Sequence, residues 1–164
     1  MTYDDSARKK SDKEFYKHEK TIRKSLGLPN CKIKTDDILD KKYAIDFICG
    51  NFLISHKTIR QPYNTFTFRI PEFGDNEYDK LKFVHEKVGY RAKVVVTTIN
   101  TVFKTLCWAE FGEISKVPIS EFHMVGTWRN DNISMQVLDH DVLRRYKGSF
   151  ATIDLSNSGM PQLI

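Results

Sequence analysis

Asp46 and Lys57 are the residues whose types and spacing best suit chemistry on a phosphate. Asp46 lies in a short β-type run at 43–49, Lys57 lies in a second run at 52–59, and the turn-forming pair Gly50-Asn51 stands between them. An antiparallel hairpin through this turn would bring Asp46 opposite the stretch that contains Lys57. The carboxylate of Asp46 could then hold Mg²⁺ or Mn²⁺, while the ammonium of Lys57 offsets charge in the transition state of phosphodiester cleavage.

The elements that must position these two residues follow from the spacing of the apolar residues. A basic helix is expected first, because Phe15, Ile22 and Leu26 share one helical face before Gly27 ends the pattern. Strict alternation predicts a third strand after the hairpin, and three consecutive valines after the next helix predict a strand buried on both faces. The expected segments are helix 6–26, strands 43–49, 52–59 and 65–70, helix 77–88, and strands 91–99 and 102–111. We therefore predict one α+β domain over residues 1–164, with the core order α-β-β-β-α-β.

The last third of the chain, residues 112–164, carries weaker signals and is expected to be a C-terminal extension. Its expected elements are helices at 119–124 and 135–146, a strand at 150–155, and a loosely held tail at 156–164. Trp128 lies in a polar stretch of this extension and is a candidate for an exposed contact.

The order of elements and the two motifs together resemble the PD-(D/E)XK nuclease superfamily, in which an aspartate on one strand precedes an acid-x-lysine triplet on the next. The stretches that carry the resemblance are Ala44-Ile45-Asp46 and Ser55-His56-Lys57, and the similarity spans residues 8–110. It implies a restriction-endonuclease-like core, a mixed central sheet flanked by helices, and a Mg²⁺- or Mn²⁺-dependent DNA endonuclease. The chain also resembles small proteins of phages and mobile elements with this fold, for which branched or recombination DNA is a substrate class.

Position 55 departs from the family pattern, because Ser55 stands where the family has its second acid. Serine is uncharged and a poor ligand for Mg²⁺, so an acid from elsewhere would have to replace it. His56 is expected on the opposite face of the strand from Ser55 and Lys57. Three glutamates remain open as the replacement, namely Glu77 at the start of the second helix and Glu14 and Glu19 in the first.

Basic residues in the first helix and around the hairpin are candidates for phosphate contacts, which would be independent of sequence and sensitive to salt. The candidates are Arg60, Arg69, Lys13, Lys17, Lys20 and Lys24. The simpler interpretation is that these lysines form the solvated face of a helix. Tyr63 could stack on a base, or it could pack within a turn.

Composition sets broader limits on the partners and the compartment. A net charge of +5 over 164 residues is compatible with a polyanionic partner such as DNA. Cys31, Cys49 and Cys107 lack metal-site spacing and are expected to be free thiols in a reducing cytoplasm. No apolar run approaches a membrane span, and the first residues do not have the pattern of a secretory signal.

Three functions therefore remain open from the sequence. The first is an active endonuclease, for which the resemblance also allows a homodimer. The second is a nuclease-like protein that has lost its chemistry and binds nucleic acid. The third is a phage inhibitor of a host defence protein, motivated by small size and appearance rather than by any residue.

Overall fold

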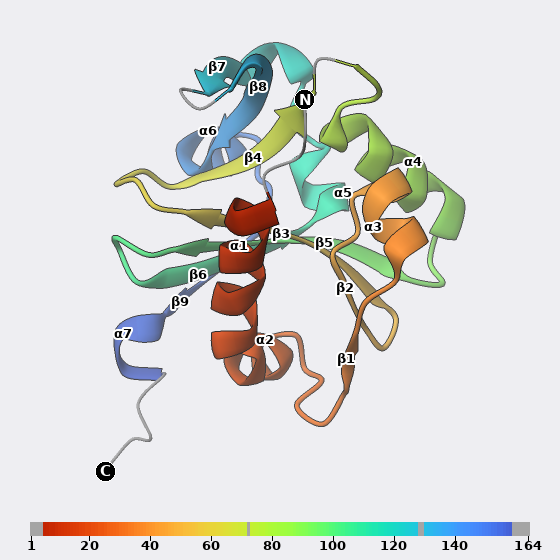
Figure 1. The fold of residues 1–164 in the computed structure, drawn as a ribbon, viewed down its shortest axis with the longest axis vertical. Coiled ribbons are helices and arrows are strands. Elements are labelled where there is room, and N and C mark those ends of the chain that lie inside the picture. The colour runs from red at the N-terminus through yellow and green to blue at the C-terminus, as the bar shows by residue number, and fades with distance from the viewer. Residues whose placement is uncertain (1–4, 72, 128–129, 159–164) are drawn as a thin grey trace.

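The structure is a computed structural model that describes residues 5–71, 73–127 and 130–158. Within these residues two sheets are present, a central one with strand order β1-β2-β3-β5-β6-β9 and a second one with order β4-β8-β7 (Figure 1). The strands are β1 (Ile33–Lys34), β2 (Phe47–Cys49), β3 (Phe52–Ile59), β4 (Thr65–Ile70), β5 (Lys93–Asn100), β6 (Thr105–Glu110), β7 (His123–Thr127), β8 (Asn130–Asp139) and β9 (Ala151–Asp154). The helices are α1 (Asp5–Lys17), α2 (Glu19–Ser25), α3 (Asp37–Tyr43), α4 (Glu77–Val88), α5 (Phe111–Ile114), the 3-10 turn η1 (Ile119–Glu121), α6 (His140–Arg145) and α7 (Leu155–Ser158). No helix in this described part is both long and apolar enough to cross a bilayer.

The central sheet is mixed. β1, β2 and β3 form an antiparallel meander, β5 runs parallel to β3, and β6 and β9 continue the sheet in antiparallel fashion. The helices α1 and α2 precede the meander and α4 precedes β5, so the order α-β-β-β-α-β is present. The expected fold class, α+β with a mixed central sheet flanked by helices, is confirmed.

The third strand of that order is not the one the sequence indicated. Residues 65–70 do form a strand, β4, but it leaves the central sheet and pairs with β8. Its place in the meander is taken by β1, which has only two residues and pairs with the end of β2. A strand this short has no periodicity to detect. The helix α3 was also missed, although Asp36 caps it by accepting a hydrogen bond of 3.0 Å from Leu39 N.

Two helices predicted in the last third of the chain were wrong. At 119–124 only the single turn η1 is helical, and the chain then enters β7. At 135–146 the first residues belong to β8, and helix α6 begins only at His140. Met135 and Val137 fit a strand as well as a helix, and pairing with β4 decides the outcome. The predicted strand at 150–155 is confirmed as β9, while Trp128 and residues 159–164 lie outside the described residues.

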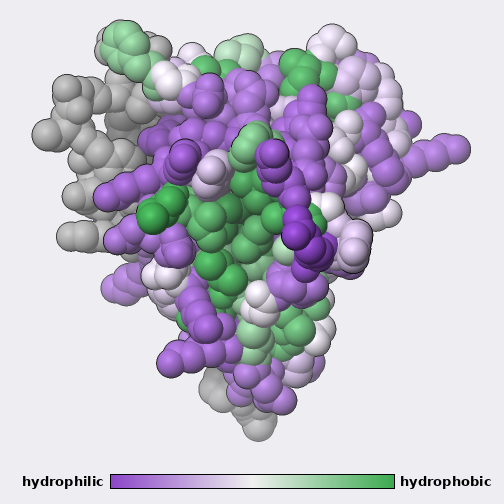
Figure 2. Space-filling model, turned by 90° about the vertical axis from the view of Figure 1, so that its right-hand side faces the viewer, coloured by the Kyte–Doolittle hydropathy of each residue, from purple (hydrophilic) through white to green (hydrophobic). Residues whose placement is uncertain are grey.

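Each face of the central sheet carries its own hydrophobic core. On one face Phe15 of α1 and Ile22 of α2 are fully buried against Ile54, Val95 and Leu106 of the sheet. On the other face α4, α5 and the inner side of the second sheet pack together, with Phe66, Phe68, Leu81, Val94 and Leu138 among the buried side chains. Outside these cores, hydrophobic residues gather in a hollow on the side of α3 and α4, ringed by hydrophilic residues (Figure 2). The central sheet is therefore covered on both faces, as a strand with consecutive valines requires.

Phe15→Ala is expected to lower the free energy of unfolding by about 3–5 kcal/mol, because it removes a fully buried ring from the core between α1 and the sheet. The ring of Phe15 stacks on Phe47 at a centroid distance of 3.8 Å. Phe73→Ala is the matched control, since Phe73 is 82% exposed and its loss should change stability little. Urea unfolding followed by circular dichroism measures both. Equal losses in the two variants would contradict the packing of α1.

Candidate functional site

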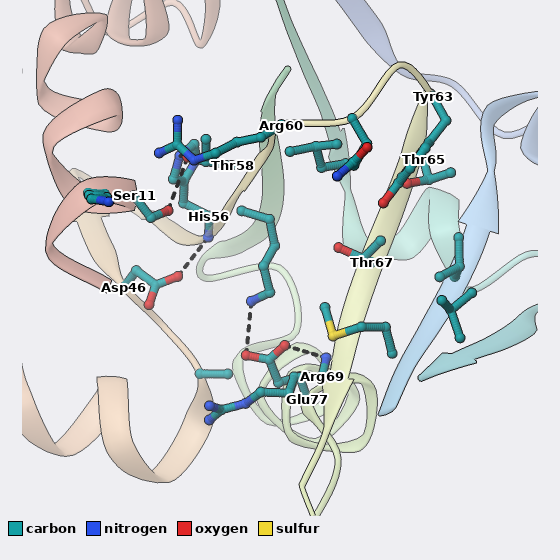
Figure 3. Close-up of a pocket in the computed structure, with 18 of the residues that line it drawn as sticks. Ser11, Asp46, His56, Thr58, Arg60, Tyr63, Thr65, Thr67, Arg69 and Glu77 are labelled. Atoms are coloured by element: carbon teal, nitrogen blue, oxygen red, sulfur yellow. Dashed lines mark hydrogen bonds and ion pairs between the residues drawn. The ribbon is translucent and has the colours of Figure 1, made fainter. Parts of the chain in front are cut away.

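A cavity of about 1210 Å³ lies between α1, strand β3 and the outer face of the second sheet. Figure 3 shows side chains from these three sides converging on it, with Asp46 next to α1, Glu77 at the base, and Thr65, Thr67 and Arg69 along β4. The cavity lies where β4 diverges from the central sheet, so two sheets form its walls. Such a space between two sheets can take a ligand larger than a single phosphate.

Lys57 and Glu77 form an ion pair that lines this cavity. Lys57 Nζ lies 2.9 Å from Glu77 Oε2, and the two side chains are only 22% and 13% exposed. Glu77 also accepts a hydrogen bond of 2.5 Å from the backbone N–H of Arg69 through Oε1. Burial alone would raise the pKa of Glu77, but the charge of Lys57 and these hydrogen bonds lower it below its ordinary value. Burial likewise disfavours the charged form of Lys57, yet Glu77 and Asp46 raise its pKa. Both groups are therefore ionised at neutral pH.

Asp46 lies beside this pair, immediately before β2 rather than within the strand. Its backbone N–H donates to Ile54 O at 2.8 Å, and its Oδ2 accepts a bond of 2.7 Å from the backbone N–H of His56. The hairpin through Gly50 therefore holds Asp46 against β3, as the sequence predicted. Burial raises the pKa of Asp46 to about 6, although the charge of Lys57 and the bond from His56 act in the opposite direction.

Ser55 is buried and is not among the residues that line the cavity. Ser55 lies two residues before Lys57 on β3, so both side chains project from the same face of the strand, but the short side chain of Ser55 does not reach the cavity. Of the three glutamates, Glu77 is the one that contacts Lys57. Oε2 of Glu14 lies 3.9 Å from Nε2 of His18. Neither Glu14 nor Glu19 is among the residues that line the cavity. The acid nearest the lysine is therefore Glu77, contributed by the first turn of α4.

His56 occupies the opposite face of β3, as expected. Its ring packs edge-on against the ring of Phe15, with a centroid distance of 5.1 Å. Nδ1 and Nε2 of the ring form hydrogen bonds of 2.8 and 3.2 Å with the hydroxyl groups of Thr97 and Thr58. Burial lowers the pKa of His56 to about 3, so the ring is neutral in the physiological range. Its role in this arrangement is to hold the end of β3 against α1, while its backbone N–H fixes Asp46.

Asp12 is a cavity residue that the sequence did not indicate. It lies on α1, lines the cavity, and its charge contributes to the raised pKa of Asp46. Nothing in its surroundings along the chain sets it apart from the other charged residues of a polar helix. Only the docking of α1 across the end of β3 brings it near Asp46.

The acids around Lys57 fit a divalent cation by their chemistry. Mg²⁺ takes oxygen ligands, keeps several waters and is often bound through one or two carboxylates, and Asp46 and Glu77 are two carboxylates in one cavity. A cation would also relieve the cost of ionising the half-buried Asp46. Among the described residues no group of three or more His, Cys, Asp or Glu side chains could hold a metal ion. A cation bound by these two acids would therefore take its remaining ligands from water or substrate.

A basic groove adjoins the cavity. We use this name for the hollow lined by Lys10, Lys13, Glu14, Tyr16, Lys17 and Arg60. Lys10 and Arg60 line both the groove and the cavity, so the two spaces lie side by side. The structure therefore brings three predicted contacts together, Lys13, Lys17 and Arg60, and places Arg69 in the cavity. Lys20 and Lys24 lie on α2 beyond the break at His18 and line neither space.

No known family model and no curated protein matches the sequence. One solved structure to which the chain is similar is that of Hjc, a Holliday junction resolvase from the archaeal hyperthermophile Archaeoglobus fulgidus. The match covers 89% of this chain and 95% of Hjc, with 11% sequence identity and a TM-score of 0.39. At this identity and TM-score the likeness shows neither a shared family nor a shared activity.

Asp46→Asn is expected to change how stability depends on pH. The pKa of Asp46 is about 6 in the folded protein and 3.8 for an ordinary aspartate, so between these values the folded state holds a proton that the unfolded state releases. The free energy of unfolding therefore falls as pH rises through this window, by up to about 1.4 kcal/mol per pH unit. The asparagine variant keeps the acceptor for His56 N–H but loses this slope.

Urea unfolding across that window measures the difference between the two proteins. The difference is the relevant quantity, because buried His56 and His140 have lowered pKa values and contribute a slope of opposite sign to both. Asp75→Asn is the control, since the side chain of Asp75 is exposed, and it should keep the wild-type profile. Identical profiles for wild type and Asp46→Asn would show that Asp46 ionises normally.

Proposed function

We propose that this protein is a Mg²⁺- or Mn²⁺-dependent endonuclease that cleaves phosphodiester bonds of DNA, with Asp46, Lys57 and Glu77 as its catalytic residues. The observation that carries the proposal is the contact of 2.9 Å between Lys57 Nζ and Glu77 Oε2, with Asp46 beside it in a large open cavity. Glu77 supplies the acid that Ser55 cannot. Branched or recombination DNA is the substrate class implied by the resemblance and stays part of the proposal, as does a homodimer.

Each member of the cluster has a distinct role in this proposal. Asp46 and Glu77 would hold the divalent cation, which supplies charge neutralisation at the phosphate and activation of water. Lys57 stays protonated because two carboxylates raise its pKa, and its ammonium stabilises the negative charge that develops on the phosphate oxygens. The backbone N–H of Arg69 holds Glu77 by a second hydrogen bond, so the carboxylate is fixed before substrate arrives.

The path of the nucleic acid follows from the basic groove. Lys10, Lys13, Lys17 and Arg60 can contact successive phosphates along α1, and Lys10 and Arg60, which also line the cavity, would lead the backbone toward Lys57. The cavity itself also contains the acids Asp12 and Asp46, which repel a phosphate. A divalent cation at these acids removes that repulsion, so close approach of DNA and binding of metal should depend on each other.

A second function, binding of nucleic acid without cleavage, is favoured by one specific observation. Both oxygens of Glu77 already accept hydrogen bonds, one from Lys57 and one from Arg69, which weakens Glu77 as a metal ligand. A nuclease-like protein that had lost its chemistry would keep the basic groove and this neutralised pair. The two functions make opposite predictions for cleavage and the same prediction for salt-dependent binding.

Cleavage should depend on all three residues of the cluster. We expect purified protein with Mg²⁺ or Mn²⁺ to cut at least one of plasmid, linear, single-stranded or four-way-junction DNA. Asp46→Asn, Glu77→Gln and Lys57→Met should each slow cleavage by about a hundredfold or more, since each removes a charge that acts on the transition state. The same metal should raise the melting temperature of wild type but not of Asp46→Asn.

Lys93→Met and Glu110→Gln are matched controls for these substitutions. They remove the same charges from an exposed pair whose atoms lie 3.7 Å apart on β5 and β6, and should leave cleavage and metal stabilisation unchanged. Failure of the folded wild type to cut any of the four substrates would reject the endonuclease and favour the second function.

Binding of DNA should lose salt dependence when the groove is neutralised. The triple variant Lys13→Ala, Lys17→Ala, Arg60→Ala should show a shallower slope of log affinity against log salt, by about 0.9 for each duplex phosphate contact removed. The double variant Lys20→Ala, Lys24→Ala is the control, because these exposed lysines line neither the groove nor the cavity. Fluorescence anisotropy with labelled DNA measures both. A larger effect of the double variant would place the DNA on α2 instead.

A further inference from the structure

We propose that the outer face of the second sheet is a platform for an unpaired nucleobase, so that the substrate presents a single-stranded or extruded nucleotide at the scissile phosphate. This inference rests on the proposed function, because that function places a phosphate of the substrate at Lys57. The inference goes further by naming the state of the nucleic acid. Its test measures binding in the absence of metal and cleavage.

The platform is formed by alternate residues of three paired strands. Across the sheet, Arg69 of β4 pairs with Met135 of β8, which pairs with Val125 of β7. In the next row Val137 lies between Thr67 and His123. Because strand residues two apart share a face, Met135, Val137 and Val125 form one apolar area with polar groups around it. All of these residues line the cavity.

This apolar area lies close to the catalytic cluster. The backbone N–H of Arg69 donates directly to Glu77, and Met135 is the cross-strand partner of Arg69. Paired residues on antiparallel strands have Cα atoms about 5 Å apart. The platform therefore begins one strand away from the residue that fixes Glu77, on the wall that faces β3 (Figure 3).

This face is open at its β7 side, where Val125 is 46% exposed, whereas Val137 and Thr67 deeper in the cavity are 6% and 8% exposed. The opposite side of the same sheet buries Phe66, Phe68 and Leu138 in the core. A site that bound only a phosphate backbone would have no use for apolar side chains opposite its cations. A base presents a flat apolar face and polar edges, and binding through that face is tolerant of sequence. Tyr63, which is 48% exposed at the rim of the cavity, adds an aromatic surface.

The platform also selects against paired bases. In a duplex both faces of a base are covered by its neighbours in the stack, and its polar edge is occupied by its partner. A base can reach Met135 and Val125 only after it leaves the stack, which costs least where the strand is already unpaired. The juxtaposition of phosphate-directed cations and an apolar wall therefore fits single strands, flaps and the crossover of a junction better than continuous duplex.

The test compares binding of a short single strand and a duplex of the same length, by fluorescence anisotropy in the presence of a chelator. Wild type should bind the single strand more tightly. Met135→Gln should weaken that binding about tenfold while changing duplex binding little, since burial of an apolar side chain against a base contributes at about this level. A fluorescent purine analogue in the single strand should change its emission on binding to wild type but not to Met135→Gln.

Met124→Gln is the matched control, because Met124 is 59% exposed and, by strand alternation, lies on the other face of β7 from Val125. It should leave both affinities unchanged. Val125→Thr, a nearly isosteric change at an exposed position, repeats the test in case Met135→Gln does not fold. Equal weakening by Met124→Gln and Met135→Gln, or no preference for the single strand, would overturn the platform.

Two other results separate the platform from the proposed function. If the protein binds duplex as well as single strand and still cleaves, the platform is wrong and the endonuclease stands. If it binds neither nucleic acid but self-associates in sedimentation, and Met135→Gln abolishes that association, the face is an interface between copies and both proposals fall.

Discussion

A lysine enclosed between two sheets needs a counter-charge, and Glu77 supplies it. One oxygen of Glu77 accepts from Lys57 on the central sheet, and the other accepts from the backbone of Arg69 on the second sheet. Because Glu77 also belongs to the first turn of α4, a single carboxylate joins three elements. Without Glu77 the pKa of Lys57 would fall, because burial disfavours the charged form and Glu77 is the main group that opposes this effect. The geometry of the cavity therefore depends on this residue more than on any other.

The two faces of strand β3 have different surroundings. His56 and Thr58 are held by hydrogen bonds in the packing against α1, while Lys57 on the other face reaches the cavity. The hydroxyl group of Ser11 on α1 bonds that of Thr58, and these polar groups stabilise the strand. The ion pair of Lys57 and Glu77 lies on the face where the two sheets separate, and Lys10 and Asp12 of α1 line the same cavity. The insertion of β4 between β3 and α4 opens that space and lets an apolar wall stand opposite the lysine.

Local signals in the sequence predicted the parts of the site that are close along the chain. The turn at Gly50 and the alternation of β3 were enough to bring Asp46 to Lys57 and to send His56 away from it. Glu77 could be named as a candidate acid because it opens a helix with periodically spaced apolar residues. The choice of Glu77 over Glu14 and Glu19 could not be made, since it depends on how α4 and α1 dock. Likewise Asp12, the pairing of β4 with β8, and the apolar platform arise from contacts between distant segments, which no local pattern encodes.

The pairing of β4 with β8 has a consequence for how the chain folds. Residues 65–70 find their partner only at 134–139, so this sheet closes a long loop and contributes slowly formed contacts. Until β8 has been synthesised, both edges of β4 are unpaired, and Phe66 lacks its contacts with His140 and Phe150. A nascent chain that ends before β8 therefore exposes a hydrophobic strand suited to aggregation. Strand β8 completes the wall of the cavity and is synthesised after β4. A partly synthesised chain therefore does not yet contain the full site.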